Sequence, residues 1–276
     1  MNPLHLLHLE WKKFSPNGTF RVLAIFYIVF YILAVYLAFR IGAKATFSAN
    51  GSTINPTQDL FLFPRSWELV AYEGRWLNVI VLGYIGVFMI TLEWSHRTLR
   101  QNIIAGLSRR EVFTAKINAI LALAAGATGC YLILGAVSGL ANSDTASLAD
   151  ALPPLDGVLR YFLQAAGYLL LGTLAGLFIR QTALATVIYF AYVIFLESVF
   201  RWILNLTVLK TKILLFLPDS VLESLIPFPI PKVAHELMGS QKIFDSLSPF
   251  QIWIAALAWL ALFSVLLFQR LKKADL

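Results

Sequence analysis

The stretch VLAIFYIVFYILAVYLAF, residues 22–39, decides the fold, because it carries no charged side chain over 18 consecutive positions. A helix needs about 20 apolar residues, rising about 1.5 Å each, to cross a hydrocarbon core roughly 30 Å thick. The rest of the chain has the same character: 59% of its 276 residues are hydrophobic and 13% are charged. The mean hydropathy is +0.74. We therefore expect an all-α integral membrane protein.

Apolar runs of similar length recur along the chain and form one transmembrane domain, residues 1–276. We expect six membrane-spanning helices, over residues 22–39, 76–92, 117–140, 161–179, 182–204 and 250–268. Only Arg180 and Gln181 separate the fourth span from the fifth, so a tight turn must join them. An even number of spans places both termini on one side of the membrane.

The first residues predict an interfacial helix before the first span. Over residues 3–14 the apolar side chains of Leu4, Leu7 and Trp11 recur at helical spacing, as in a helix that lies on a membrane surface. The basic pair Lys12 and Lys13 follows the apolar part, unlike the order in a signal peptide, so we expect the first span to be retained.

Lys and Arg are concentrated in the segments that we expect on the same side of the membrane as the N-terminus. The positive-inside rule therefore predicts that both termini of a multi-pass protein lie in the cytoplasm, at the cytoplasmic (inner) membrane. The net charge of +7 then reflects a basic rim that meets anionic lipid. We expect no nucleic-acid binding, because no soluble basic module is visible.

Three segments are expected on the outer side. Residues 41–75 form a polar loop, and residues 141–157 are short and acidic. Residues 205–249 are too apolar for a solvated loop, yet Pro218, Pro227, Pro229 and Pro231 interrupt them. We expect this segment to be partly re-entrant, dipping into the membrane before the last span.

The sequence shows no cluster of nucleophilic, acid–base or metal-ligating residues. The four histidines are scattered, no HExxH motif occurs, and the single Cys130 lies in an apolar run, so we expect no catalytic residue and no metal site. His5 and His8 stand at i and i+3, but interfacial packing explains them better than a metal without a third ligand. No GxxxxGK[ST] loop is present, so we expect no cofactor on this chain and no enzymatic activity of its own.

Two features inside the spans have open interpretations. Glu197 and Arg201, at i and i+4, could form a gate that contacts substrate or a structural ion pair at the outer end of the fifth span. Small-residue pairs occur in the third span (Gly135 and Gly139) and in the fourth (Gly172 and Gly176). These pairs predict close helix packing, within one chain or between subunits.

The cytoplasmic segment 96–110 is more elaborate than a connection between two spans requires. It begins the stretch HRTLRQNIIAGLSRREVFTAK, His96–Lys116, which predicts a short helix from Thr98, a break at Gly106 and a capped restart. Ser108 and Glu111 stand three residues apart, the spacing of a capping box. A solvated basic loop is the simplest interpretation, but the adjacent Ile103 and Ile104 favour a helix that docks on a partner.

This stretch resembles the segment between the second and third spans of ABC-2 type permeases, the membrane subunits of type V ABC transporters. The pattern is carried by Glu93, Thr98, Arg100, Ser108, Arg109 and Lys116. The sequence departs from it at Arg97, where many members have Gly, and at Gly106 and Leu107, where many have Pro shortly before Ser-Arg. The interfacial helix, six spans and membrane-dipping segment resemble the family in outline over the whole chain.

The resemblance implies a permease subunit that forms a substrate path, in the export direction, within an assembly of two permeases and two ATPases. It implies a coupling helix that rests on a separate cytoplasmic ABC ATPase, which binds the ATP and Mg. The second permease is an identical or a different chain, and membrane lipid surrounds both. The implied coupling residues are Arg100, Gln101, Ile103, Ile104, Leu107, Ser108 and Arg109, with Glu93, Thr98 and Lys116 supporting them at the inner interface. The alternative is a non-transporting membrane scaffold or an immunity-type protein.

Overall fold

The structure is a computed structural model of the whole chain. It describes residues 3–42, 47–49, 52–54, 58–96, 98–142, 151–197, 199–200, 203, 212–229 and 247–273. These residues form long helices and one short antiparallel hairpin, in which Phe47 pairs with Ile54 and Ala49 with Ser52.

The elements follow one another in this order: α1 Pro3–Phe14, α2 Gly18–Gly42, β1 Phe47–Ala49, β2 Ser52–Ile54, η1 Gln58–Phe61, α3 Ser66–Leu77, η2 Asn78–Leu82, α4 Gly83–Ser95, α5 Thr98–Ile104, α6 Arg109–Asn142, α8 Leu155–Ile179, α9 Thr182–Phe190, η3 Ala191–Leu196, η4 Lys212–Phe216, α11 Pro218–Leu225 and α13 Pro249–Lys273. The segments η2 and η3 are π-helical, and η2 joins α3 to α4 without a break.

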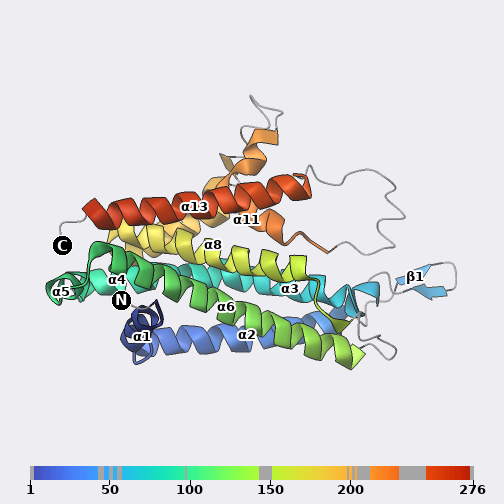
Figure 1. Cartoon of the computed structure of the whole chain (residues 1–276). Coiled ribbons are helices and arrows are strands. Elements are labelled where there is room, and N and C mark those ends of the chain that lie inside the picture. Colours follow the sequence, from blue (N-terminus) through green and yellow to red (C-terminus); the bar gives the residue numbers. More distant parts are fainter. Residues whose placement is uncertain are drawn as a thin grey trace.

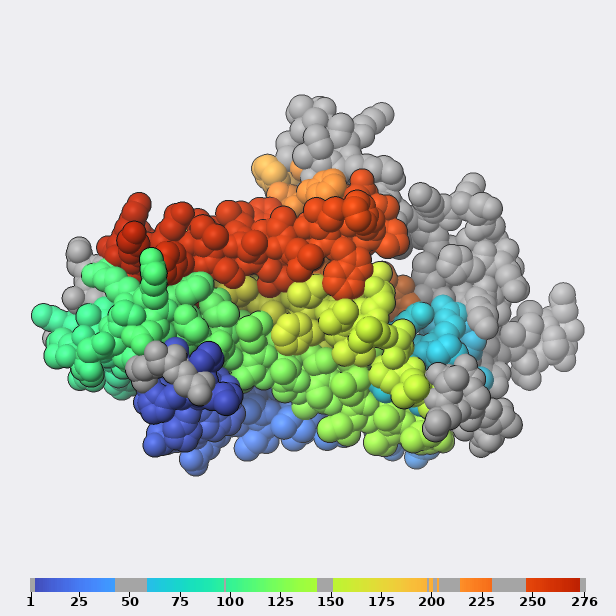
Figure 2. Space-filling model, viewed as in Figure 1, coloured from blue at the N-terminus to red at the C-terminus, as the bar shows by residue number. Residues whose placement is uncertain are grey.

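The long helices run side by side as one bundle, with α8 in contact with α4, α6 and α13 (Figure 1). α13 forms one edge of the view and α1 with α2 the opposite edge (Figure 2). Both ends of the described chain lie at the end of the bundle that carries α1 and α5, which we call the proximal end. The hairpin lies beyond the other end, the distal end (Figure 1).

Five helical segments are long and apolar enough to span a membrane: Gly18–Gly42, Ser66–Ser95, Arg109–Asn142, Leu155–Ile179 and Pro249–Lys273. A sixth apolar segment, Thr182–Leu196, is shorter. The chain is therefore an all-α, multi-pass membrane protein. The predicted continuation of the fifth span includes residues 201, 202 and 204, which lie outside the described residues.

The second span differs most from its predicted range of 76–92. It begins at Ser66, so residues 66–75 are helix and not part of a polar outer loop. Trp67, Val70, Ala71 and Gly74 form a buried stripe at helical spacing along α3. Charged residues between them lower the mean hydropathy of this stretch. The span is amphipathic because it packs inside the protein.

Other boundaries shift by less. The fourth span begins at Leu155, before the predicted residue 161, and the third and sixth extend beyond 117–140 and 250–268. The turn between α8 and α9 is as tight as predicted, with Arg180 in the left-handed region at φ 60°. Its guanidinium lies 4.3 Å from the centre of the Trp94 ring, which helps to hold this strained residue.

The predicted outer segment 205–249 is described only in part, over 212–229 and 247–249. Within it, α11 packs against α8 and α13, and most of its side chains are buried. The Arg75 guanidinium of α3 donates to the Ile226 carbonyl at 3.0 Å and pairs with Glu223 at 3.1 Å. This short helix is thus an integral part of the bundle.

The closest helix packing is between α4 and α8. A Cβ atom added to Gly172 would meet the carbonyl oxygen of Gly83, and one added to Gly86 would meet the carbonyl oxygen of Leu169. A Cβ atom on Gly176 would meet Ile90 and the Val87 carbonyl. The two backbones therefore touch where neither helix has a side chain.

Gly135 and Gly139 of α6 instead leave space for aromatic rings. The ring of Trp67 covers Gly135 and the ring of Phe63 covers Gly139. The structure thus places both glycine pairs in contacts within one chain, which was one of the two alternatives left open by the sequence.

A chain of buried polar groups crosses the middle of the bundle. The Tyr27 hydroxyl donates to Asn78 Oδ1 at 2.9 Å, and Asn78 Nδ2 donates to Gln164 Oε1 at 3.2 Å. Gln164 Nε2 in turn donates to the Leu222 carbonyl at 3.1 Å. These bonds link α2, η2, α8 and α11 in sequence, since polar groups away from water need partners.

Replacing Gly172 with Ala should destabilise the protein by about 1–3 kcal/mol, because the new methyl group meets backbone that cannot rotate aside. Thermal unfolding in detergent, followed by loss of the monodisperse peak, measures this. Gly126→Ala is the matched control, since nothing lies within 4 Å of its Cβ position. Equal melting temperatures for both variants would contradict the close contact.

Candidate functional site

The predicted coupling segment forms a seven-residue helix, α5, between α4 and α6 at the proximal end. It ends in a Schellman motif: the Gly106 amide donates to the Ile103 carbonyl at 3.0 Å and the Leu107 amide to the Asn102 carbonyl at 3.0 Å. Gly106 has a φ of 97°, a conformation in which a side chain would be strained.

The restart after this turn is the predicted capping box. The Ser108 amide donates to Glu111 Oε2 at 2.9 Å, and the Glu111 amide donates to Ser108 Oγ at 3.3 Å. These bonds satisfy amides at the start of α6 that would otherwise lack acceptors. The length and direction of the connection between α5 and α6 are thereby fixed.

The two faces of α5 differ. Leu99 is buried and anchors the helix to the bundle, whereas the Ile104 side chain is 76% exposed. Arg100 and Gln101 are exposed, and Ile103 and Leu107 are half-buried. In the space-filling view, α5 projects beyond the proximal end (Figure 2). Its outer face therefore presents basic and apolar groups together.

A buried ionic cluster lies beside α5 and consists of Glu10 and Lys13 from α1, Glu93 from α4, and Lys116 from α6. The Lys116 ammonium pairs with Glu10 and, at 2.7 Å, with Glu93 Oε1. Lys13 pairs with Glu10 at 2.5 Å and with the same Glu93 oxygen at 3.0 Å. The exposed fraction is 2% for Glu10 and 1% for Lys116. The cluster joins three helices and has no net charge.

The electrostatics of this cluster favour its charged form. Burial acts to raise the pKa of the Glu10 carboxyl, but the positive charges of Lys116 and Lys13 outweigh it and hold the pKa below its usual value of 4.5. The Phe14 ring covers Lys116, whose Nζ lies 5.0 Å from the ring centre. The ion pairs are thus shielded from water on one side by an aromatic ring.

Three buried polar atoms at the joint between α4 and α5 have no hydrogen-bond partner among the described residues. They are Glu93 Oε2, Trp94 Nε1 and Thr98 Oγ1. Unsatisfied buried groups cost about 1–3 kcal/mol each, so this joint is less tightly bonded than the cluster beside it. The joint is the part of the proximal end best suited to movement.

A groove of about 420 Å³ separates α1 from the turn after α5. Leu6, Leu9 and Val112 give it apolar walls, and Glu10 and Lys13 of the ionic cluster reach its edge. The turn residues Gly106 and Leu107 form its outer lip. A displacement of α5 would therefore change the width of this groove.

Arg109 has a role within the chain that the sequence did not predict. Its guanidinium donates to the Leu271 carbonyl at 3.3 Å and to the Lys272 carbonyl, at the C-terminal end of α13. A cation at this position satisfies carbonyls that the helix leaves free and complements its dipole. Arg109 thus ties the start of α6 to the end of α13.

Glu197 is buried and caps α11. Its carboxylate accepts hydrogen bonds from the Ser220 amide at 2.6 Å, the Asp219 amide at 3.0 Å and the Tyr192 hydroxyl at 2.7 Å. A negative charge at a helix N-terminus is favourable, so Glu197 fixes α11 in the bundle. Arg201 lies outside the described residues, so the predicted ion pair between the two remains a prediction.

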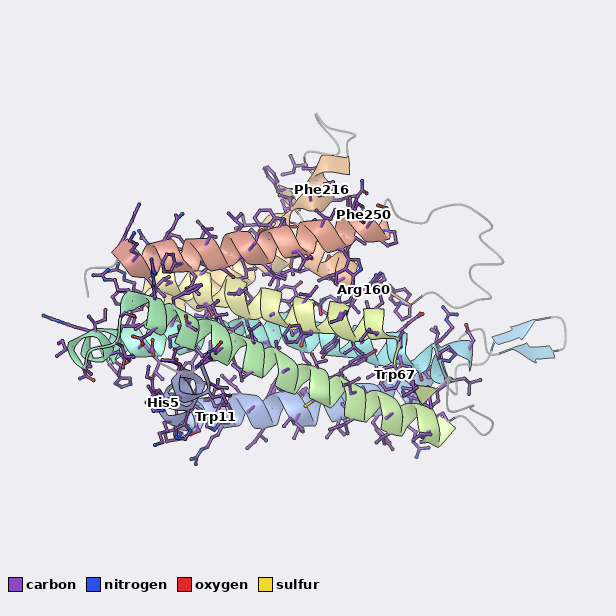
Figure 3. The ribbon with its side chains drawn as sticks, viewed as in Figure 1. His5, Trp11, Trp67, Arg160, Phe216 and Phe250 are labelled. Atoms are coloured by element: carbon purple, nitrogen blue, oxygen red, sulfur yellow. The ribbon has the colours of Figure 1, made fainter. Side chains whose placement is uncertain are left out.

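Two members of the ionic cluster, Glu10 and Lys13, were not predicted from the sequence. Glu10 and Lys13 are three residues apart on one face of α1, a spacing that indicates a shared partner. His5 and Trp11 lie on the same helix, at the proximal end (Figure 3). Among the described residues, no group of three metal-ligating side chains occurs.

Comparison of the chain with protein-family models and with curated proteins gives no match. The resemblance to ABC-2 permeases therefore rests on the quoted residues and on the outline of the architecture.

Replacing Lys116 with Met should cost about 3–5 kcal/mol of stability, because it leaves Glu10 and Glu93 buried with only Lys13 between them. Adding Glu10→Gln to this variant removes the excess negative charge and should recover part of the melting temperature. Lys12→Met is the matched control, since Lys12 is an exposed lysine of α1, the helix that carries Glu10. If K116M and K12M melt at the same temperature, the cluster does not contribute to the stability of the fold.

The lowered pKa of Glu10 predicts that the ionic cluster stabilises the protein less in acid. Its folded pKa lies below its unfolded value, so the stabilisation is complete above about pH 4.5 and is lost as the pH falls through the folded pKa. The melting temperature of the natural protein should therefore fall more steeply below about pH 4.5 than that of Glu10→Gln. Parallel pH profiles for the two proteins would contradict this contribution.

Proposed function

We propose that this chain is the permease subunit of an ABC transporter of the ABC-2 type, driven by a separate ATPase that docks on α5. The observation that supports this most is the placement of α5. It is a short helix that a Schellman turn closes and that a capping box joins to α6; its exposed face is basic and apolar, and the buried ionic cluster ties the neighbouring spans together. A passive loop between two spans needs neither the caps nor the cluster.

In this mechanism, movement of the ATPase pushes on the exposed face of α5. The Gly106 turn transmits the displacement to α6, because this connection is short and capped, and Leu99 anchors α5 to the bundle beside α4. Glu93 and Lys116 hold these two spans to each other and to α1 through Glu10. The three helices would tilt as a rigid body.

The six-span architecture belongs to the same proposal. The segment Thr182–Leu196 would be the core of the fifth span, with both termini in the cytoplasm and α1 at the inner membrane surface. The substrate path would run between this permease and a second permease copy, in the export direction. The chain would bind no nucleotide, and the partner would supply ATP and Mg.

Substitutions on the exposed face of α5 should uncouple transport without unfolding the protein. Ile104→Asp and Arg100→Glu should reduce copurification of the ATPase and ATP-dependent flux in liposomes by about tenfold or more, because both side chains are exposed where the partner would bind. Lys12→Glu is the matched control, an exposed charge reversal on α1 at the same end.

We favour Arg100 over Arg109 for this test, because Arg109 also holds α13 and its loss would confuse docking with folding. Unchanged flux in both α5 variants would exclude the coupling role. Stable capture of some other protein, with no ATP-dependent flux, would favour the scaffold alternative.

A further inference from the structure

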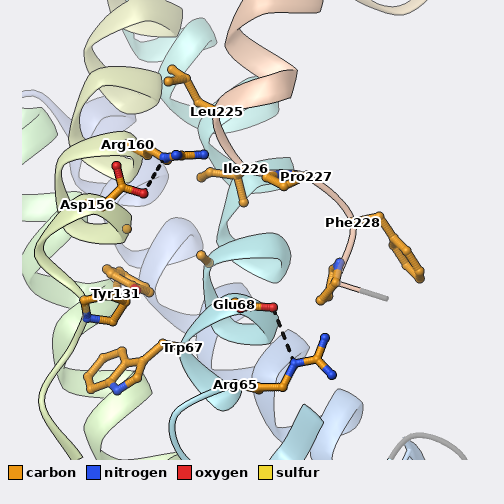
Figure 4. A pocket seen from close by; sticks show the side chains of 14 residues that line it. Arg65, Trp67, Glu68, Tyr131, Asp156, Arg160, Leu225, Ile226, Pro227 and Phe228 are labelled. Carbon is orange, nitrogen blue, oxygen red and sulfur yellow. Dashed lines mark ion pairs between the residues drawn. The ribbon is translucent and has the colours of Figure 1, made fainter. Parts of the chain in front are cut away.

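The distal end contains a cavity of about 600 Å³ that the proposed transport mechanism does not use. It lies between the first turns of α3 and α8, with Tyr131 of α6 on one side and residues 225–229 after α11 on the other (Figure 4). Figure 3 places Trp67 and Arg160 away from the α1 residues His5 and Trp11, along the bundle toward the distal end. The cavity therefore lies far from α5.

Four charged side chains line the cavity in two pairs. Arg160 Nε lies 2.7 Å from Asp156 Oδ2, and Arg65 Nε lies 3.8 Å from Glu68 Oε2. Arg65 also donates to Asp59, which does not line the cavity. Figure 4 shows the Arg160 side chain extending toward Ile226 and the Arg65–Glu68 pair at the start of α3. With two positive and two negative groups, the cavity has no net charge.

Two donors that line this cavity have no acceptor among the described residues. Arg160 Nε makes no hydrogen bond there although Asp156 is close, because the two groups are an ion pair without hydrogen-bond geometry. The Arg160 side chain is only 19% exposed. Trp67, which is 2% exposed, also leaves its Nε1 without a partner among the described residues. Buried donors in native proteins normally have acceptors, so a bound group would supply what the protein does not.

The walls are apolar and aromatic. Trp67 and Tyr131 pack edge to face with ring centres 5.6 Å apart, and Phe228 and the flanking prolines close the opposite side. Rings can contact an alkyl group or cover a cationic ammonium group. Charged side chains are costly in hydrocarbon, so we place the cavity at the depth of the lipid headgroups.

We infer that this cavity binds a zwitterionic headgroup of the phosphocholine or phosphoethanolamine type, with its anionic group on Arg160 and its cationic group beside the rim carboxylates and aromatic rings. A simple anion would face Glu68 and Asp156 as well as the arginines, and a simple cation would face the arginines. Only a ligand with both charges matches both pairs. This binding belongs to the chain itself and requires no ATPase.

The test is a titration of the purified full-length chain, in dodecyl maltoside micelles, with dihexanoylphosphatidylcholine. Intrinsic tryptophan fluorescence follows binding, because Trp67 lines the cavity. The expected result is saturable binding, weaker by about tenfold or more for dihexanoylphosphatidylglycerol, which lacks the cationic group. Arg160→Gln should weaken phosphatidylcholine binding by a similar factor.

Phe228→Ala serves as a second variant, because Phe228 is exposed and its removal should leave the fold intact while weakening binding severalfold. Arg40→Gln is the matched control, an exposed arginine of α2 that does not line this cavity. Glycerophosphocholine, which has no acyl tails, distinguishes a soluble zwitterionic ligand from a membrane lipid. Binding comparable to that of the tailed lipid indicates a soluble zwitterion, and its failure indicates a lipid of the membrane; either supports the site.

Equal binding of the two headgroups would overturn the zwitterionic class. Unchanged binding in both Arg160→Gln and Phe228→Ala would overturn the location. Because neither measurement involves ATP or α5, these outcomes are separate from failure of the proposed transport function.

Discussion

The contact on which the rest of this structure depends is the backbone approach of α4 and α8. Lipid tails are as apolar as leucine, so helices in a membrane associate through close packing and polar bonds. Gly172 on α8 lies against the Gly83 carbonyl of α4, and Gly86 on α4 lies against the Leu169 carbonyl of α8, so a side chain at Gly172 or Gly86 would separate the backbones. This approach brings Asn78 within reach of Gln164, and Gln164 within reach of α11. Widening this contact would break the polar chain as well as the packing.

The ionic cluster acts on this frame at one end only. Removing four charges from water is expensive, and the attraction between them repays the cost only when the geometry is good. The cluster is neutral and its two lysines each contact both glutamates, so it specifies how α1, α4 and α6 meet. Hydrophobic side chains could join the same helices, but they would not fix one arrangement so sharply. The unsatisfied atoms at Glu93, Trp94 and Thr98 concentrate the remaining freedom in the joint with α5.

Features that depend on neighbouring residues could be predicted from the sequence. Residues 22–39 are uniformly apolar, the capping box needs only Ser108 and Glu111, and the turn at Arg180 and Gln181 leaves no other conformation for the chain. The prediction for residues 66–75 was wrong because a hydropathy average detects a helix that is apolar on all sides. α3 has one apolar stripe, which is buried in protein, and charged residues between the members of that stripe. The pairing of Glu10 with Lys116 joins residues 106 positions apart, so no local pattern predicts it. The cap on α11 by Glu197 is missed for the same reason.

The two ends of the bundle use the same residue types for different purposes, and hydrogen bonding separates them. The ionic cluster and the lining of the cavity each have two basic and two acidic side chains. At the proximal end carboxylates engage both ammonium groups, so the cluster leaves no cation without an acceptor, although Glu93 Oε2 has no donor among the described residues. At the distal end Arg160 is paired by charge but its Nε makes no hydrogen bond within the described residues, and the indole Nε1 of Trp67, which lines the same cavity, is also unsatisfied there. A cluster without unpaired cations resists rearrangement and holds its three helices together. A cavity with unpaired donors can bind another molecule, and on this ground we propose force transmission at one end and ligand binding at the other.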